Sequence, residues 1–310
     1  MSKKNLYLGG LLIVLVIAAY FYNGPWQKMQ ADKGKVKNFL SKINVEDIDF
    51  IDVSALGKTI VLEKNGDRWK IGGTKDFYVE DALVTTLTSG LAEAQKADME
   101  LASENKDKKA DFETDEAGGI LVKLRQGDKA LSEFFIGKAS NNFSAAYISP
   151  VGDDKTYLLK SPLNGLFAHE DWHDKKIFSS DKDRITKIRF QYPNREFTIE
   201  KKDDVWTGVA PSKFTVNAEK LSEILTLMSG ILSAKIPEQS FAGTGLEKSG
   251  VIVQATGEGI DNTIMIGNIY KGEDAGEQEY YYAKKGVSDN IYLVTKSNRQ
   301  ALDKNIWDLR

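Results

Sequence analysis

The sequence predicts an α+β fold class, in which an N-terminal transmembrane helix precedes two homologous, mainly antiparallel α+β domains in a tandem repeat. The first observation is a repeated spacing, because Trp69 precedes Trp172 by 103 residues and Trp206 precedes Trp307 by 101, although the chain has only 5 Trp. The second is that each half combines short apolar runs, separated by turn residues, with one longer amphipathic stretch. The third is an uncharged run close to the N-terminus.

The repeat extends to glycines and tyrosines between these tryptophans. One glycine in each half closes an apolar run, and one tyrosine lies fifteen residues before the last tryptophan of its half. The matched landmarks are Trp69, Gly137, Tyr157 and Trp172 in the first half, and Trp206, Gly267, Tyr292 and Trp307 in the second. A period of more than 100 residues indicates two related domains, since solenoid repeats are about 20 to 50 residues long.

These patterns divide the chain into four parts. Residues 1–26 form a cytoplasmic tail and transmembrane anchor, and residues 27–44 form an amphipathic connector. The first α+β repeat covers residues 45–178 and the second covers residues 179–310. A length of 310 residues suits two domains of ordinary size.

Within each repeat the apolar alternation predicts three strands, a helix, four strands and a short closing helix that carries the last tryptophan. The first repeat has strands over 48–53, 59–63, 68–71, 120–125, 131–136, 144–149 and 155–159, with a helix over 79–97. The second has strands over 185–192, 196–201, 205–208, 251–255, 263–266, 280–284 and 290–295, with a helix over 217–234 that Asn217 caps. The charged stretch 98–118 is expected to be a solvated loop.

The N-terminal run favours a membrane anchor. Lys3 and Lys4 precede seventeen uncharged residues, 6–22, which as a helix would extend about 25 Å, at the lower end of what spans a bilayer core. Aromatic residues lie near both ends, and the small-residue cleavage site of a signal peptide is poorly matched. We therefore expect an uncleaved signal anchor, with a cleaved signal peptide and a buried soluble helix as alternatives. The bulk of the chain is expected outside the cytoplasmic membrane.

Composition excludes several functional classes. A net charge of −3, with basic and acidic residues interleaved, argues against nucleic acid as a partner. The absence of cysteine excludes disulfides, thiolate catalysis and iron–sulfur clusters. The sequence also contains no phosphate-binding loop and no G-x-S-x-G nucleophile elbow, so its Gly243-Thr-Gly245 segment is interpreted as a turn. No cofactor is predicted.

One motif suggests an enzyme. His169, Glu170 and His173 match H-E-x-x-H, in which two histidines one helical turn apart bind zinc and the glutamate activates water. A catalytic zinc needs three protein ligands, and these are the only 2 histidines of the chain. The matching segment of the second repeat keeps Trp307 and has no histidine. We therefore interpret the segment as a structural helix whose tryptophan packs, and predict no catalytic or metal-binding residue.

The sequence resembles a bacterial family of uncharacterised membrane-anchored proteins that are typically encoded beside ABC-type export permeases and gliding-motility auxiliary proteins. The residues that carry the resemblance are the strand–turn–Trp openings at 63–69 and 200–206, and the junction at 171–178. At this junction His173 stands where the family typically has a basic residue, often arginine. The resemblance implies an accessory subunit of a transporter-like complex at the cytoplasmic (inner) membrane, on its periplasmic side.

Three functional hypotheses follow. The leading one is a non-enzymatic, membrane-anchored extracytoplasmic accessory or scaffold subunit, held in the membrane by residues 6–22 and bound to a permease or a sister envelope subunit. The alternatives are a zinc-dependent hydrolase that uses His169, Glu170 and His173, and a ligand-binding module with a pocket between the two repeats.

Overall fold

The computed structural model describes residues 3–23, 34–73, 75–248 and 250–310, with the backbone alone at residues 3–10 and 23. The first element is the helix α1 (Lys3–Asn23). Its large apolar side chains from Leu11 to Tyr22 are 52% to 71% exposed. Over the ranges just given, no helix is both long enough and apolar enough to cross a membrane.

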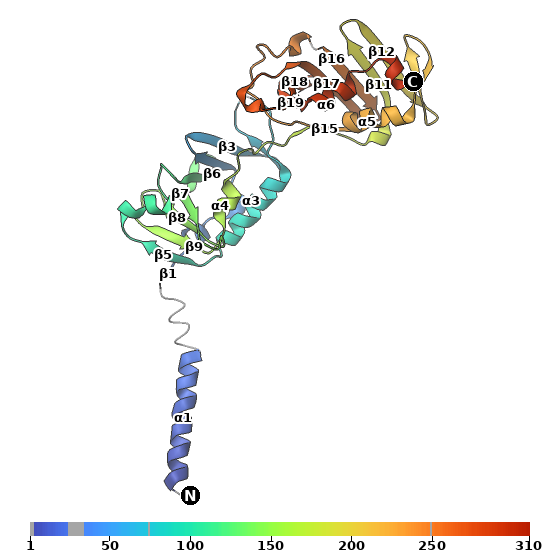
Figure 1. Ribbon diagram of the computed structural model, residues 1–310. Helices are drawn as coiled ribbons and strands as arrows, with labels where there is room; N and C mark the ends of the chain where they lie inside the picture. The colour runs from blue at the N-terminus through green and yellow to red at the C-terminus, as the bar shows by residue number, and fades with distance from the viewer. Residues whose placement is uncertain (1–2, 24–33, 74, 249) are drawn as a thin grey trace. The chain divides into compact units, whose positions relative to one another are not determined.

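The chain folds as two compact units (Figure 1). The second unit includes a segment that lies in the sequence between the two parts of the first. Unit 1 comprises Met1–Trp69 and Ala82–Asp171, whereas unit 2 comprises Lys70–Asp81 and Trp172–Arg310. We call Lys70–Asp81 the crossing segment. Since it separates the two parts of unit 1 in the sequence, the chain passes from one unit to the other three times.

Unit 1 is built on a 9-stranded sheet in the order β1-β5-β9-β8-β7-β6-β2-β3-β4. Its pairings that the structure describes are all antiparallel. The strands are β1 (Lys35–Val36), β2 (Phe50–Ala55), β3 (Lys58–Asn65), β4 (Arg68–Ile71), β5 (Met99–Ser103), β6 (Ile120–Gln126), β7 (Lys129–Ala139), β8 (Ala146–Pro150) and β9 (Thr156–Leu159).

Few helices accompany this sheet. Helix α3 (Asp81–Ala94) buries Leu87, Leu91 and Ala94 along one stripe, as its apolar spacing predicts. Helix α4 (Leu163–Phe167) has only five residues and contacts β7. The remaining helical turns are the 3-10 segments η1 (Phe39–Lys42), η2 (Val45–Asp47), η3 (Lys106–Lys108) and η4 (Ala110–Phe112).

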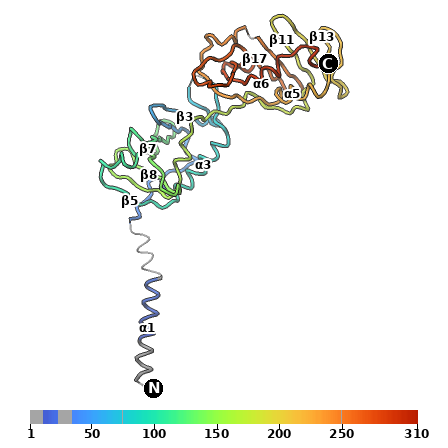
Figure 2. Tube along the Cα trace, viewed as in Figure 1, coloured from blue at the N-terminus to red at the C-terminus, as the bar shows by residue number. Residues whose placement is uncertain are grey.

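Unit 2 is built on an 8-stranded antiparallel sheet in the order β14-β13-β12-β11-β16-β17-β18-β19. β11 and β17 belong to this one sheet, although α5 separates them in the sequence. Figure 2 traces the chain through these elements. The strands are β11 (Ile185–Tyr192), β12 (Arg195–Lys202), β13 (Val205–Ala210), β14 (Phe214–Thr215), β16 (Val251–Gly257), β17 (Ile260–Ile269), β18 (Tyr280–Lys285) and β19 (Tyr292–Thr295). A separate pair joins β10 (Lys176–Ser179) to β15 (Gly230–Leu232).

The core of unit 2 lies between this sheet and its helices. Helix α5 (Ala218–Ser229) buries Leu221, Ile224 and Met228, and the Asn217 side chain accepts hydrogen bonds from the first turn, which confirms the predicted cap. Helix α6 (Lys296–Leu302) also contacts β16. Further 3-10 turns are η5 (Lys182–Arg184), η6 (Leu246–Lys248), η7 (Glu273–Ala275) and η8 (Ile306–Leu309).

The predicted α+β fold class is wrong. The protein is mainly antiparallel β, with more residues in strands than in helices, and α1 is the only α-helix among the described residues of the first 80. The physical reason is that most strands are joined by tight hairpins, which leave no room for a helix between them. The closing helix expected around Trp172 is one of the missing elements, because residues 168–172 have no regular structure.

Two further segments differ from expectation. The charged stretch 98–118 is not entirely loop, since it contributes β5 to the sheet between β1 and β9. The amphipathic connector 27–44 lies partly outside the described residues, and its described part begins the sheet with β1 and continues into η1.

Candidate functional site

The segment that matches H-E-x-x-H is not a helix. His169 and Glu170 follow α4 in an irregular stretch, and His173 forms a single antiparallel bridge with Val79 of the crossing segment. The two histidines also belong to different units, His169 to unit 1 and His173 to unit 2. The spacing that would place both imidazoles on one helical face therefore has no counterpart in this fold.

The His173 ring packs against an aromatic side chain. Its centroid lies 4.9 Å from that of Phe77, with the two rings edge to face. Within the described ranges, no group of three histidine, cysteine, aspartate or glutamate side chains is placed to hold a metal ion. The geometry around His173 is thus that of a packed ring beside the crossing segment.

The four landmark tryptophans have two different environments. Trp69, Trp172 and Trp206 are buried, whereas Trp307 on η8 is 73% exposed. The Arg310 guanidinium lies 4.4 Å from the centre of the Trp307 ring. The packing role predicted for Trp307 is therefore wrong.

The landmark glycines share one physical role. A Cβ atom at Gly137 would lie 2.0 Å from the carbonyl oxygen of Phe112, and one at Gly267 would lie 2.2 Å from the carbonyl oxygen of Thr244. Each glycine thus lets a long strand, β7 or β17, run directly against the backbone of the segment that precedes the neighbouring strand, β6 or β16.

The landmark tyrosines are held by burial and hydrogen bonds. The Tyr157 hydroxyl donates to Asp153 Oδ2 over 2.9 Å, and burial followed by this bond raises the pKa of Tyr157 to about 12. Burial also raises the pKa of Tyr292, whose ring lies edge to face with Phe77. Both tyrosines consequently remain neutral hydrogen-bonding groups near neutral pH.

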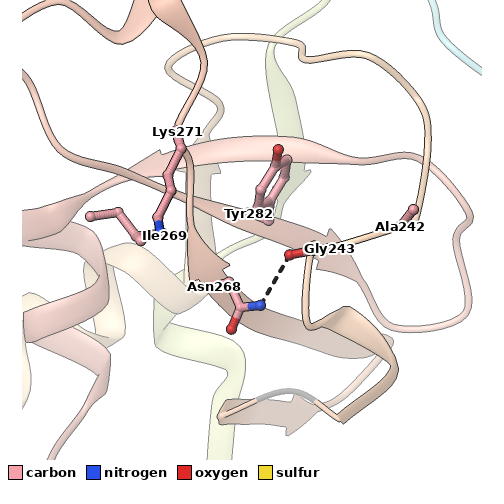
Figure 3. Close-up of a pocket in the computed structure, with 6 residues that line it drawn as sticks. All are labelled: Ala242, Gly243, Asn268, Ile269, Lys271 and Tyr282. Atoms are coloured by element: carbon pink, nitrogen blue, oxygen red, sulfur yellow. Dashed lines mark hydrogen bonds between the residues drawn. The ribbon is translucent and has the colours of Figure 1, made fainter.

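A hollow on unit 2 is a candidate site (Figure 3). It has a volume of about 430 Å³, within the range of small-ligand pockets. It lies where the end of β17 and the start of the next loop meet β18 and the loop before η6. Its lining residues are Ala242, Gly243, Asn268, Ile269, Lys271 and Tyr282.

Hydrogen bonds fix the loop that forms one side of this hollow. Asn268 Nδ2 donates to the Gly243 carbonyl oxygen over 3.0 Å, and the Asn268 backbone N–H donates to the Thr244 carbonyl oxygen over 2.7 Å. The buried Thr244 hydroxyl donates to the Phe241 carbonyl oxygen over 2.8 Å. Gly243 and Gly245 both have positive φ, so the segment interpreted as a plain turn from the sequence is an ordered wall.

An aromatic contact and hydrogen bonds hold Tyr282, on another side of the hollow. The Tyr282 ring lies edge to face with that of Tyr270, at 5.4 Å between centroids. The Tyr270 hydroxyl donates to Asp274, and this bond, with burial, raises the pKa of Tyr270 to about 12. The same hydrogen bond, together with that from Lys235, lowers the pKa of Asp274. Asp274 is therefore ionised and already neutralised by its partners.

The fold and this hollow define a mainly antiparallel β protein with a shallow polar site on unit 2. A sequence profile of the family described as Domain of unknown function (DUF4340) matches residues 69–237, just over half of the chain. The chain belongs to this family. The match begins at Trp69, next to the crossing segment, and continues into unit 2. Comparison with the curated proteins and with the solved structures gave no match.

Proposed function

We propose that this protein is a non-enzymatic accessory or scaffold protein that α1 attaches to a membrane, with both β-rich units on the extracytoplasmic side. The observation that carries the proposal is the surface of α1. Its ten large apolar side chains between Leu11 and Tyr22 are all more than half exposed. A water-soluble protein rarely exposes so continuous an apolar surface.

The magnitude of the effect supports attachment. Burial of one large apolar side chain contributes roughly 1.5 to 3 kcal/mol. Even at half that value, ten such side chains would contribute on the order of 10 kcal/mol on entering an apolar phase. This is enough to hold the chain at a membrane against dilution in water.

The partner proposed is a membrane permease or a sister envelope subunit. This part of the proposal is supported by the resemblance to proteins encoded beside export permeases, and by the two broad β-sheets, which offer surface for contacts between proteins. Neither the zinc hydrolase nor a pocket between the two halves of the chain is favoured by a specific observation.

Membrane attachment is tested by charging α1. In the double variant Ile13→Lys and Ile17→Lys, each change removes the roughly 1.5 to 3 kcal/mol that burial of a large apolar side chain contributes and adds the cost of moving a charge out of water. The matched control is Val205→Lys with Val287→Lys, two exposed apolar positions of unit 2. We expect the unmodified chain and the control to remain with membranes after an alkaline carbonate wash, and the α1 variant to be released. Release of the unmodified chain would contradict the proposal.

The side of the membrane and the partner need separate measurements. Protease added outside the cytoplasmic membrane should digest both units in intact spheroplasts; protection of both units would place them inside. Affinity purification of the full chain in mild detergent should enrich a permease or envelope subunit over the α1 variant. Recovery of neither would remove the accessory role while leaving attachment intact.

A further inference from the structure

The hollow on unit 2 has one lysine in its lining, and two more lie beside a nearby aromatic ring. Lys271 lies in its lining, and the ammonium groups of Lys75 and Lys284 lie 5.3 Å and 5.8 Å from the centre of the Phe241 ring, next to Ala242. None of the three forms an ion pair with any residue in the described ranges. Lys75 instead donates to the backbone carbonyl of Asp289 over 2.9 Å. Lys271 therefore gives the lining of the hollow one positive charge.

Several other basic side chains of unit 2 are neutralised by carboxylates. On the open face of the sheet, Lys187 pairs with Glu200 at 2.8 Å, and Arg189 pairs with Glu196 at 2.7 Å. At the hollow the adjacent carboxylate, Asp274, is occupied by Tyr270 and Lys235. Lys271, the one charged side chain in the lining of the hollow, favours an anionic ligand.

The remaining groups suit a ring that carries hydroxyls. Tyr282 presents an aromatic ring in the wall, and its contact with Tyr270 fixes the orientation of that ring. Asn268 uses its amide N–H to hold Gly243, which leaves its side-chain oxygen to accept from a ligand hydroxyl. The C–H face of a sugar ring is apolar and packs on aromatic rings, whereas its hydroxyls need such polar neighbours.

We propose that this hollow binds an acidic sugar, with the sugar ring on Tyr282, its hydroxyls at Asn268 and its carboxylate at Lys271. The volume of about 430 Å³ accommodates one or two sugar rings. The walls are fixed before binding by the hydrogen bonds to Thr244 and Gly243, so little ordering is required. This inference goes beyond the membrane attachment proposed above and does not depend on it.

The test uses the full chain in detergent and four probes in ligand-observed NMR and titration calorimetry. The probes are glucuronate, glucose, inorganic phosphate and adenosine monophosphate. We expect glucuronate to bind most tightly, with saturation transfer to its ring protons. Equal binding of glucose would refute the role of charge. Equal binding of phosphate would show that the hollow takes any anion, and tighter binding of the nucleotide would refute the sugar assignment. No binding of glucuronate at millimolar concentrations would overturn the proposal.

Variants locate the binding. Lys271→Gln should weaken glucuronate binding on the order of tenfold and leave glucose binding unaffected. The control Lys285→Gln changes an exposed lysine at the end of β18, the strand that carries Tyr282, and should change neither. Tyr282→Leu should abolish saturation transfer, and Tyr282→Phe, which keeps the ring, should retain it. Melting temperatures of all variants identify any loss of fold. A well-folded Lys271→Gln protein that binds glucuronate as tightly as the unmodified chain would place the ligand elsewhere.

Discussion

Phe77 connects the crossing segment to the core of unit 2, and its removal should destabilise that unit selectively. The side chain is 5% exposed and belongs to the same buried cluster as Phe190, on β11, and Val253, on β16. Its ring also lies edge to face with His173 and Tyr292. Replacement of a buried phenylalanine by alanine typically costs about 3 to 5 kcal/mol, because apolar contacts are lost and a cavity remains. That is a large share of the roughly 5 to 15 kcal/mol that stabilises a domain.

The assay is hydrogen–deuterium exchange of the full chain, followed by mass spectrometry. In Phe77→Ala, amides of β11 and β16 should exchange roughly a hundred to several thousand times faster, the factor that 3 to 5 kcal/mol implies. Amides of β6 and β7 in unit 1 should be unaffected. The control is Phe143→Ala, the same chemical change at a 77% exposed position in unit 1, which should alter stability by less than about 0.5 kcal/mol. Equal loss of exchange protection in both units, or no loss in unit 2, would refute the assignment of the crossing segment to unit 2.

Three further predictions concern single side chains. Gly267→Ala should lower the stability of unit 2 by about 1 to 3 kcal/mol in a thermal melt, because the new Cβ would meet the Thr244 carbonyl oxygen. Gly165→Ala is the control, since its Cβ would meet no atom within 4 Å, and it should be neutral or slightly stabilising. Trp172→Ala should cost about 3 to 5 kcal/mol in urea unfolding, and Trp307→Ala less than about 1 kcal/mol; similar losses would contradict the difference in burial. Burial raises the pKa of Tyr192 to about 12. The stability that the neutral hydroxyl contributes should therefore be complete below about pH 10, the pKa of an unfolded tyrosine, and be lost as the pH rises towards 12. Tyr192→Phe should flatten this part of the curve of unfolding free energy against pH.

Sequence patterns located most strands because local rules determine them. β4 and β11 have the predicted bounds, since alternating apolar residues and adjacent turns leave little choice of register. β5 was missed because it buries only Met99 fully and is surrounded by charged residues, so its periodicity is weak. Its place in the sheet depends on β1 and β9, which are distant in sequence.

The candidate site was beyond sequence reasoning for a related reason. Its groups come from the loop at Gly243, the end of β17 at Asn268 and the middle of β18 at Tyr282, and none of these short stretches has a motif. The available signal was the pair of glycines around Thr244, which indicated a turn but not which residues pack beside it. Conversely, H-E-x-x-H has the right spacing for zinc, but the spacing is informative only on a helix, and this stretch is irregular.

The crossing segment also imposes an order on synthesis. Lys70–Asp81 leaves the ribosome about 90 residues before Trp172, where the rest of unit 2 begins. At about 5 to 20 residues per second, the segment waits roughly 5 to 20 s for His173 and longer for Tyr292. During that interval Phe77 has no core to enter, although the first strands of unit 1 are already available. The nascent chain must therefore keep an apolar side chain unburied while unit 1 forms on either side of it, so this is the stage at which the chain is most exposed to chaperones, proteases and aggregation.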